Sequence, residues 1–80
     1  RALSYKNIRS RFVAYLFEQK LVDNNIVHID HNQAQLADYI CVTRPALTKE
    51  ISKMAKEGLI LMKGKTVELL NIPELRKAIL

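Results

Sequence analysis

The sequence predicts a winged helix-turn-helix, which is a mainly α-helical domain with a small β-hairpin. The first observation is a stretch at residues 32–58, NQAQLADYICVTRPALTKEISKMAKEG, in which only residues 41–43 separate two amphipathic segments. A connection that short forms a tight corner between two helices. The second observation is a pair of strand-like runs, residues 59–62 and 66–70, joined by residues 63–65. A hairpin directly behind a helix pair is the arrangement of a winged helix.

The first helix of the pair is predicted at residues 33–40. Asn32 can accept a hydrogen bond from the free backbone amides of the first turn, and Gln35 can reach back to the backbone of Asn32, as in a capping box. Apolar residues share one face of a 3.6-residue period: Leu36, Ala37 and Ile40. We expect this face to be buried.

The second helix is predicted at residues 44–57. Thr43 is its N-cap, and Pro45 lies in the first turn, where its missing amide hydrogen costs nothing. Gly58 ends the helix, because glycine adopts a left-handed conformation at little cost. Core-facing residues recur at i, i+4 and i+7: Leu47, Ile51 and Met54. The opposite, basic face carries Arg44, Pro45, Thr48, Lys49, Ser52, Lys53 and Lys56.

Another amphipathic helix is predicted before the pair, at residues 7–20, with Ser4 or Asn7 as its N-cap. Its apolar stripe is Ile8, Phe12, Tyr15 and Leu16. The remaining expected elements are a turn at residues 23–25, a short strand at residues 26–29, and a closing helix at residues 73–80 with apolar Leu75, Ile79 and Leu80.

Length and composition limit the chain to one small domain, residues 1–80. Its 80 residues are 49% apolar and contain no low-complexity run, so a second domain or a linker has no place. No apolar run approaches the roughly 20 residues of a membrane span, and no charged-then-apolar leader precedes a small-residue cleavage site, so we expect a protein that is neither membrane-spanning nor exported. The single cysteine cannot form an internal disulfide, which favours a reducing cytoplasm. Because the chain opens on Arg1, we expect a fragment of a longer protein.

The net charge of +5 is concentrated in two stretches. Residues 1–20, which include Arg9 and Arg11, hold five basic side chains and one acid, and residues 44–65 hold six basic side chains and two acids. Such clusters are typical of phosphate binding, although a solvated basic surface explains the charge alone equally well. Together with the predicted helix pair, they favour a nucleic-acid ligand.

Patterns of catalysis and metal binding are absent from the sequence. Its serines lack a His–Asp partner signature, no phosphate loop is present, and the acids are scattered singly, so we expect neither an enzyme nor a cofactor. His28 and His31 form an H-x-x-H pattern, but residues three apart on a strand point to opposite faces and no third ligand stands nearby. We therefore expect no metal site.

Several segments of the chain match the pattern of one known family. They are LSYKNIRSRF at residues 3–12, Leu36-Ala37, VTRPAL at residues 42–47, EGLI at residues 57–60 and Gly64-Lys65. Over nearly its whole length the chain therefore resembles the C-terminal DNA-binding domain of the Crp/Fnr family of bacterial transcription regulators. In that family the domain follows an effector-binding β-barrel and a dimerisation helix. The resemblance implies a fragment that lacks both, with residues 1–6 as the hinge end.

The resemblance implies sequence-specific binding of double-stranded DNA, with the recognition helix, residues 44–57, in the major groove and the wing, residues 63–65, on the backbone. The full-length protein would be a cytoplasmic homodimer that contacts RNA polymerase, whereas the fragment would be a monomer. Two alternatives are a winged helix used for protein contact, which needs an apolar exposed helix face, and an RNA-binding module.

The resemblance also assigns site residues by position. Base contacts fall on Arg44, Pro45 and Lys49. Arg44 can donate two hydrogen bonds to a guanine, but Pro45 replaces the glutamate of some members and offers only shape and apolar contact. Lys49 replaces an arginine and lacks the bidentate fork. Phosphate contacts are expected from Gln33, Thr43, Lys53, Lys63 and Lys65.

Cys41 lies where many family members have glycine, at the corner residue that we expect to need a positive φ. Replacement by glycine would then stabilise the fold by roughly 0.5–1 kcal/mol. We favour a small buried residue over a redox switch, because no basic neighbour in the motif is obviously placed to activate the thiol.

Overall fold

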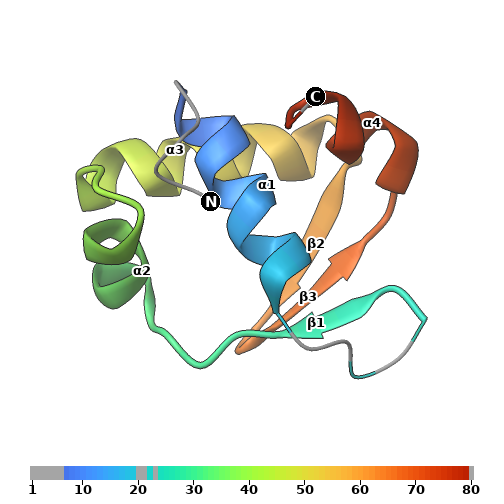
Figure 1. Ribbon diagram of the computed structural model, residues 1–80, viewed down its shortest axis with the longest axis horizontal. Helices are drawn as coiled ribbons and strands as arrows, with labels where there is room; N and C mark the ends of the chain where they lie inside the picture. The colour runs from blue at the N-terminus through green and yellow to red at the C-terminus, as the bar shows by residue number, and fades with distance from the viewer. Residues whose placement is uncertain (1–6, 20–21, 23, 80) are drawn as a thin grey trace.

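The computed structural model describes residues 7–19, 22 and 24–79. Over these residues the elements follow in the order α1 (Ile8–Glu18), β1 (Ile26–His28), α2 (Gln33–Tyr39), α3 (Arg44–Lys56), β2 (Ile60–Lys63), β3 (Thr66–Leu69) and α4 (Ile72–Lys77). Helix α1 crosses in front of α3, α2 lies at one end of the molecule, and the small sheet and α4 lie at the other (Figure 1). The predicted winged helix-turn-helix is confirmed.

Helices α1 and α2 begin where the predicted capping residues place them. Asn7 caps α1, because its Oδ1 accepts a hydrogen bond from the Ser10 amide at 2.7 Å. The alternative cap, Ser4, lies outside the described residues, and α1 ends at Glu18, two residues before the expected end at residue 20. Asn32 caps α2, and both halves of the predicted capping box with Gln35 are formed, at 2.8 and 3.0 Å.

Helices α2 and α3 end in the same hydrogen-bond pattern. After α2, the Cys41 amide donates to the Asp38 carbonyl and the Val42 amide donates to the Ala37 carbonyl, at 3.2 and 2.9 Å. After α3, the amides of Gly58 and Leu59 form the equivalent pair of bonds. This is the Schellman motif, which requires a left-handed residue just beyond the helix.

Cys41 supplies that left-handed residue at the corner, with a φ of 61°, as expected. Gly58 supplies it after α3, with a φ of 78°. The prediction that Cys41 is buried is wrong, because the residue is exposed. The core is filled at this point by its neighbours Ile40, which is buried, and Val42, which packs against the core.

The sheet has three antiparallel strands in the order β1-β3-β2. The predicted hairpin is present, but β2 runs over Ile60–Lys63, one residue later than expected. Leu59 cannot begin the strand, because its amide closes the end of α3 by donating to the Met54 carbonyl. The loop is therefore Gly64 and Lys65 alone, and Gly64 has a φ of 58°, which suits the first position of a type II′ turn.

The core draws residues from every layer of the fold. All the predicted core residues of α2 and α3 are buried: Leu36, Ala37, Ile40, Leu47, Ile51 and Met54. Helix α1 buries a wider arc than its predicted stripe, since Val13 and Ala14 are buried beside Phe12, Tyr15 and Leu16, while Ile8 packs at the edge. A helix that is covered on several sides loses its solvent face, which explains the extra burial.

Helix α4 begins at Ile72, one residue before the prediction, because Asn71 caps it by accepting from the Glu74 amide at 3.3 Å. The helix ends at Lys77, short of the expected residue 80, which lies outside the described residues. Leu75 is buried, as predicted. None of the helices in the described part of the chain is long and apolar enough to cross a membrane.

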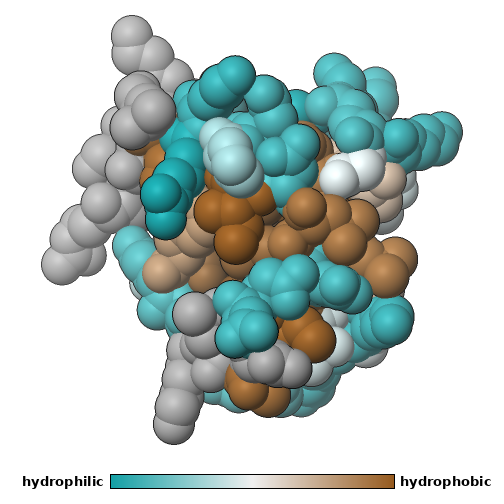
Figure 2. Space-filling view, turned by 90° about the vertical axis from the view of Figure 1, so that its right-hand side faces the viewer, coloured by the Kyte–Doolittle hydropathy of each residue, from teal (hydrophilic) through white to brown (hydrophobic). Residues whose placement is uncertain are grey.

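A band of apolar surface crosses the side of the molecule that lies to the right in Figure 1 (Figure 2). The large apolar side chains that are most exposed in the described residues are Val22, Tyr39, Leu61 and Leu70. A groove between α1, the sheet and α4 is lined by Phe17, Leu69, Ile72 and Arg76, among others. The fold therefore has an apolar surface that differs in character from the outer face of α3.

Candidate nucleic-acid interface

The outer face of α3 is exposed and basic, as predicted. Its exposed residues are Arg44, Pro45, Thr48, Lys49, Ser52, Lys53 and Lys56. Arg44 and Lys49 form no ion pair with the carboxylates of the described residues, so their cationic groups remain in solvent. These two cations and Pro45 lie in the first two turns of the helix, where side chains can reach into a groove.

Thr43 places a hydroxyl beside the free amides at the start of α3. Its Oγ1 accepts a hydrogen bond from the Ala46 amide at 3.3 Å, which leaves its own proton free to donate. The positive end of the helix dipole lies at the same place. A hydroxyl donor at a helix N-terminus is well suited to a phosphate oxygen.

Gln33, at the start of α2, is tied to α3 by its side chain. The Thr48 hydroxyl donates to Gln33 Oε1 at 2.7 Å. Because the carbonyl oxygen of the amide is held by Thr48, the amide nitrogen is left as the donor that faces away from this bond. The contact also joins the two helices of the motif on their outer side.

The lysines of the wing, residues 63–65, are held by a fixed backbone. Lys63 ends β2 and Lys65 lies in the two-residue turn, and both side chains are exposed. The Thr66 hydroxyl donates to the Lys63 carbonyl at 2.8 Å, and the Ile29 amide donates to the Lys65 carbonyl at 2.8 Å. The second bond anchors the wing to the segment after β1, a pairing that the sequence did not predict.

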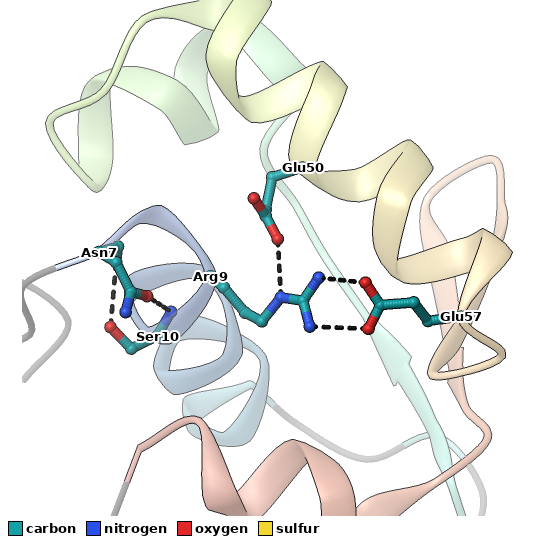
Figure 3. A network of polar contacts seen from close by, with 5 residues as sticks. All are labelled: Asn7, Arg9, Ser10, Glu50 and Glu57. Atoms are coloured by element: carbon teal, nitrogen blue, oxygen red, sulfur yellow. Dashed lines mark hydrogen bonds and ion pairs between the residues drawn. The ribbon is translucent and has the colours of Figure 1, made fainter.

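Arg9 and Arg11 are the two cations of the first basic stretch that the structure describes, and both bind within the domain. Arg9 donates from Nε to Glu50 at 2.7 Å and from its two terminal nitrogens to both oxygens of Glu57 at 2.9 and 2.8 Å (Figure 3). Arg11 donates to the carbonyls of Ile40 and Cys41 at 3.3 and 3.2 Å. These two cationic groups are therefore engaged by carboxylates and backbone carbonyls of the domain.

The ion pair between Arg9 and Glu57 changes the ionisation of both groups. Its hydrogen bonds, and the charge of Arg9, lower the pKa of Glu57 below the ordinary glutamate value. The same hydrogen bonds, followed by the single one to Glu50, raise the pKa of Arg9. The sequence contained a signal for this site that we did not use, namely two acids seven residues apart on one side of a basic helix.

The two histidines belong to different surroundings. Strand β1 ends at His28, and His31 lies three residues beyond it, before α2. His31 Nδ1 shares a hydrogen bond with the hydroxyl of buried Tyr15 at 2.8 Å, and its ring stacks on Tyr39. Burial raises the pKa of Tyr15, so the hydroxyl keeps its proton. In the described part of the chain, no group of three or more His, Cys, Asp or Glu side chains could hold a metal ion.

The fold is similar to that of known transcription regulators. A CRP-family transcriptional regulator from Thermus thermophilus superposes with a TM-score of 0.80 at 22% identity, over 98% of this chain and 43% of the other. FixK2 from Bradyrhizobium japonicum superposes with a TM-score of 0.83 at 19% identity, over 96% of this chain and 40% of FixK2. The CO-dependent transcription factor CooA from Carboxydothermus hydrogenoformans superposes with a TM-score of 0.80 at 17% identity, over 99% of this chain and 39% of CooA. The chain thus spans about two-fifths of the length of each of these proteins.

The fold and the exposed basic helix define a winged helix-turn-helix of the DNA-binding class. The model of the Crp-like helix-turn-helix domain matches residues 10–78, so the chain belongs to that family, whose domains bind DNA in transcription regulation. No curated protein is similar enough in sequence to count as a relative. The family resemblance read from the sequence is therefore confirmed.

Proposed function

We propose that the chain binds double-stranded DNA sequence-specifically as the C-terminal domain of a Crp/Fnr-type transcription regulator. Helix α3 would enter the major groove, and the wing would lie on the flanking backbone. The observation that carries the proposal is the outer face of α3, which is exposed, basic and free of ion pairs at Arg44 and Lys49. A protein-contact role is less well supported, because it calls for an apolar face at this position.

The base contacts follow from the chemistry of the first two turns of α3. The guanidinium of Arg44 can donate two hydrogen bonds to O6 and N7 of a guanine. Lys49, one turn later, can donate to a guanine or a phosphate as a point charge. Pro45 contributes shape and apolar contact only, so the base beside it is read less strictly.

Donors around the helix supply the phosphate contacts, which fix the register of the protein on the duplex. They are Gln33, Thr43, Lys53, Lys63 and Lys65. The hydroxyl proton of Thr43 and the amide nitrogen of Gln33 are both left free by the internal bonds that hold these side chains. Their orientation before binding lowers the entropy cost of association.

The full-length protein would act as a homodimer on two inverted half-sites about 34 Å apart. RNA polymerase would be its second partner. The fragment contains one recognition helix, so we expect it to be a monomer that binds a single half-site weakly. Sedimentation that shows a tight dimer of the fragment would contradict this part of the proposal.

Substitution of the two kinds of contact tests the proposal. Arg44→Ala should cost about 1–3 kcal/mol on the selected site and relax one base position, whereas Lys63→Ala should weaken binding to all sequences alike and lower the salt slope by about one. The duplex would be selected from random sequences, and structured RNA would serve as a competitor. Arg76→Ala, which removes an exposed cation on α4, is the matched control and should leave binding unchanged.

Three results would count against the proposal. Equal losses on specific and random DNA for Arg44→Ala would exclude base reading by this residue. A loss for Arg76→Ala as large as that for Lys63→Ala would show that net charge, and not the wing, determines binding. Stronger competition by RNA than by duplex DNA would favour an RNA ligand.

A further inference from the structure

Helix α3 carries two carboxylates on the side that faces α1. Glu50 and Glu57 are seven residues apart, which is about two helical turns, so they lie on the same side of the helix. Arg9 of α1 reaches between them and binds both (Figure 3). The only acids of α3 and its C-cap are therefore neutralised by a residue from another helix.

Lys53 lies between these two acids on the same helix. It follows Glu50 by three residues and precedes Glu57 by four, and residues at these spacings are neighbours on a helix surface. Its charge acts on Glu57, where it helps to lower the pKa of the carboxyl. Yet Lys53 forms no ion pair with a described residue, and its side chain is exposed.

Arg9 binds the carboxylate oxygens that are also within reach of a lysine at position 53. Both oxygens of Glu57 accept from the terminal nitrogens of Arg9, and one oxygen of Glu50 accepts from Nε. A planar guanidinium binds a carboxylate through two parallel bonds, which a lysine ammonium cannot do. Without Arg9, the flexible side chain of Lys53 would turn back to one of the two carboxylates.

We propose that Arg9 is a positioning residue for DNA binding, which holds Glu50 and Glu57 so that the ammonium of Lys53 stays free to contact a phosphate. This inference rests on the proposed function, because it assigns Lys53 to the DNA backbone. Arg9 itself does not touch DNA. It acts across the interface between α1 and α3, on the side of the recognition helix that faces away from the bases.

The salt dependence of DNA binding tests the inference. Each phosphate contact contributes about 0.9 to the slope of log affinity against log salt, which is about a 3.5-fold change in affinity between 50 and 200 mM salt. Lys53→Ala should reduce the magnitude of the slope by about 0.9, the value of one phosphate contact. Arg9→Ala should reduce it by the same amount. The double variant should lose one contact in total and not two, because both changes remove the same ammonium from the DNA.

Two further variants separate this effect from net charge and from misfolding. Arg9→Lys keeps the charge but lacks the fork, so we expect it to lower the slope as Arg9→Ala does, in a chain of unchanged charge. In a Glu50→Gln/Glu57→Gln background no carboxylate is left to capture Lys53, so removing Arg9 there should not change the slope. Circular dichroism at the assay temperature confirms that each variant is folded.

The outcomes distinguish this inference from the proposed function. If Lys53→Ala lowers the slope and neither Arg9 variant does, the inference is wrong and the DNA contact of Lys53 stands. Additive losses for Arg9→Ala and Lys53→Ala would also overturn it. If Lys53→Ala leaves the slope unchanged while the wild type binds duplex DNA, the phosphate role of Lys53 is wrong and the inference falls with it.

Discussion

At the corner between α2 and α3, Cys41 adopts a left-handed backbone conformation that favours glycine. Cys41 has a φ of 61°. A residue with a Cβ is strained by about 1–2 kcal/mol in the left-handed region, and glycine removes this strain. Part of that gain is lost, because glycine gives up about 0.5–1 kcal/mol more backbone entropy on folding. Cys41→Gly should therefore stabilise the domain by about 0.5–1 kcal/mol.

Urea denaturation measures this change, and in a thermal scan it corresponds to a rise in Tm of about 2–8 °C for a domain of this size. Cys41→Ala is the matched control. It keeps a Cβ and the same φ but removes the thiol, and because Cys41 is exposed its stability should stay close to that of the wild type. A Cys41→Gly variant no more stable than Cys41→Ala would refute the argument from backbone strain.

Three other predictions concern a backbone position, an ion pair and a hydrogen bond. Gly58→Ala should destabilise the domain by about 0.5–1 kcal/mol in urea, since the φ of 78° is strained for alanine and a Cβ there meets nothing within 4 Å. A Gly58→Ala variant as stable as the wild type would show that the backbone at residue 58 relaxes to another φ. Because Arg9 lowers the pKa of Glu57, this pair stabilises the fold above the ordinary glutamate pKa of about 4.3 and loses its effect as pH falls below it. The difference in urea midpoint between wild type and Arg9→Ala should thus shrink from about pH 7 to about pH 3, and a constant difference would contradict this. Tyr15→Phe should lower the free energy of unfolding by about 0.5–1.5 kcal/mol, because it removes the hydrogen bond to His31. In a double-mutant cycle, the same substitution made in a His31→Ala variant should leave the free energy of unfolding unchanged.

Much of the fold could be predicted because its signals are local. The caps at Asn32 and Thr43 and the left-handed residue at Cys41 each depend on groups within five residues of one another. The 3.6-residue period then identified the buried faces of α2 and α3. The starts of β2 and α4 differ from the prediction by one residue, because the end of one element sets the start of the next. The ends of the elements differ by one to three residues, most of all at α4.

The errors of interpretation concern exposure and partners. Cys41 was expected to be buried because small apolar residues usually are, but the left-handed turn leaves it in solvent. The charge of Arg9 and Arg11 was visible in the sequence, but their partners within the domain were not. The pairing of β1 with β3 was likewise missed, since nothing in the short strand identifies its neighbour.

By itself the sequence determined the helices, their caps, the corner, the wing and the family, because each of these depends on residues that are close in the chain or on a recognisable motif. Only the tertiary structure decided the strand order and which cations are free. Arg9 meets Glu50 and Glu57 across 41 and 48 residues, a distance over which no sequence period acts. Packing alone brings these groups together, and it thereby sets which part of the positive charge is left for a ligand.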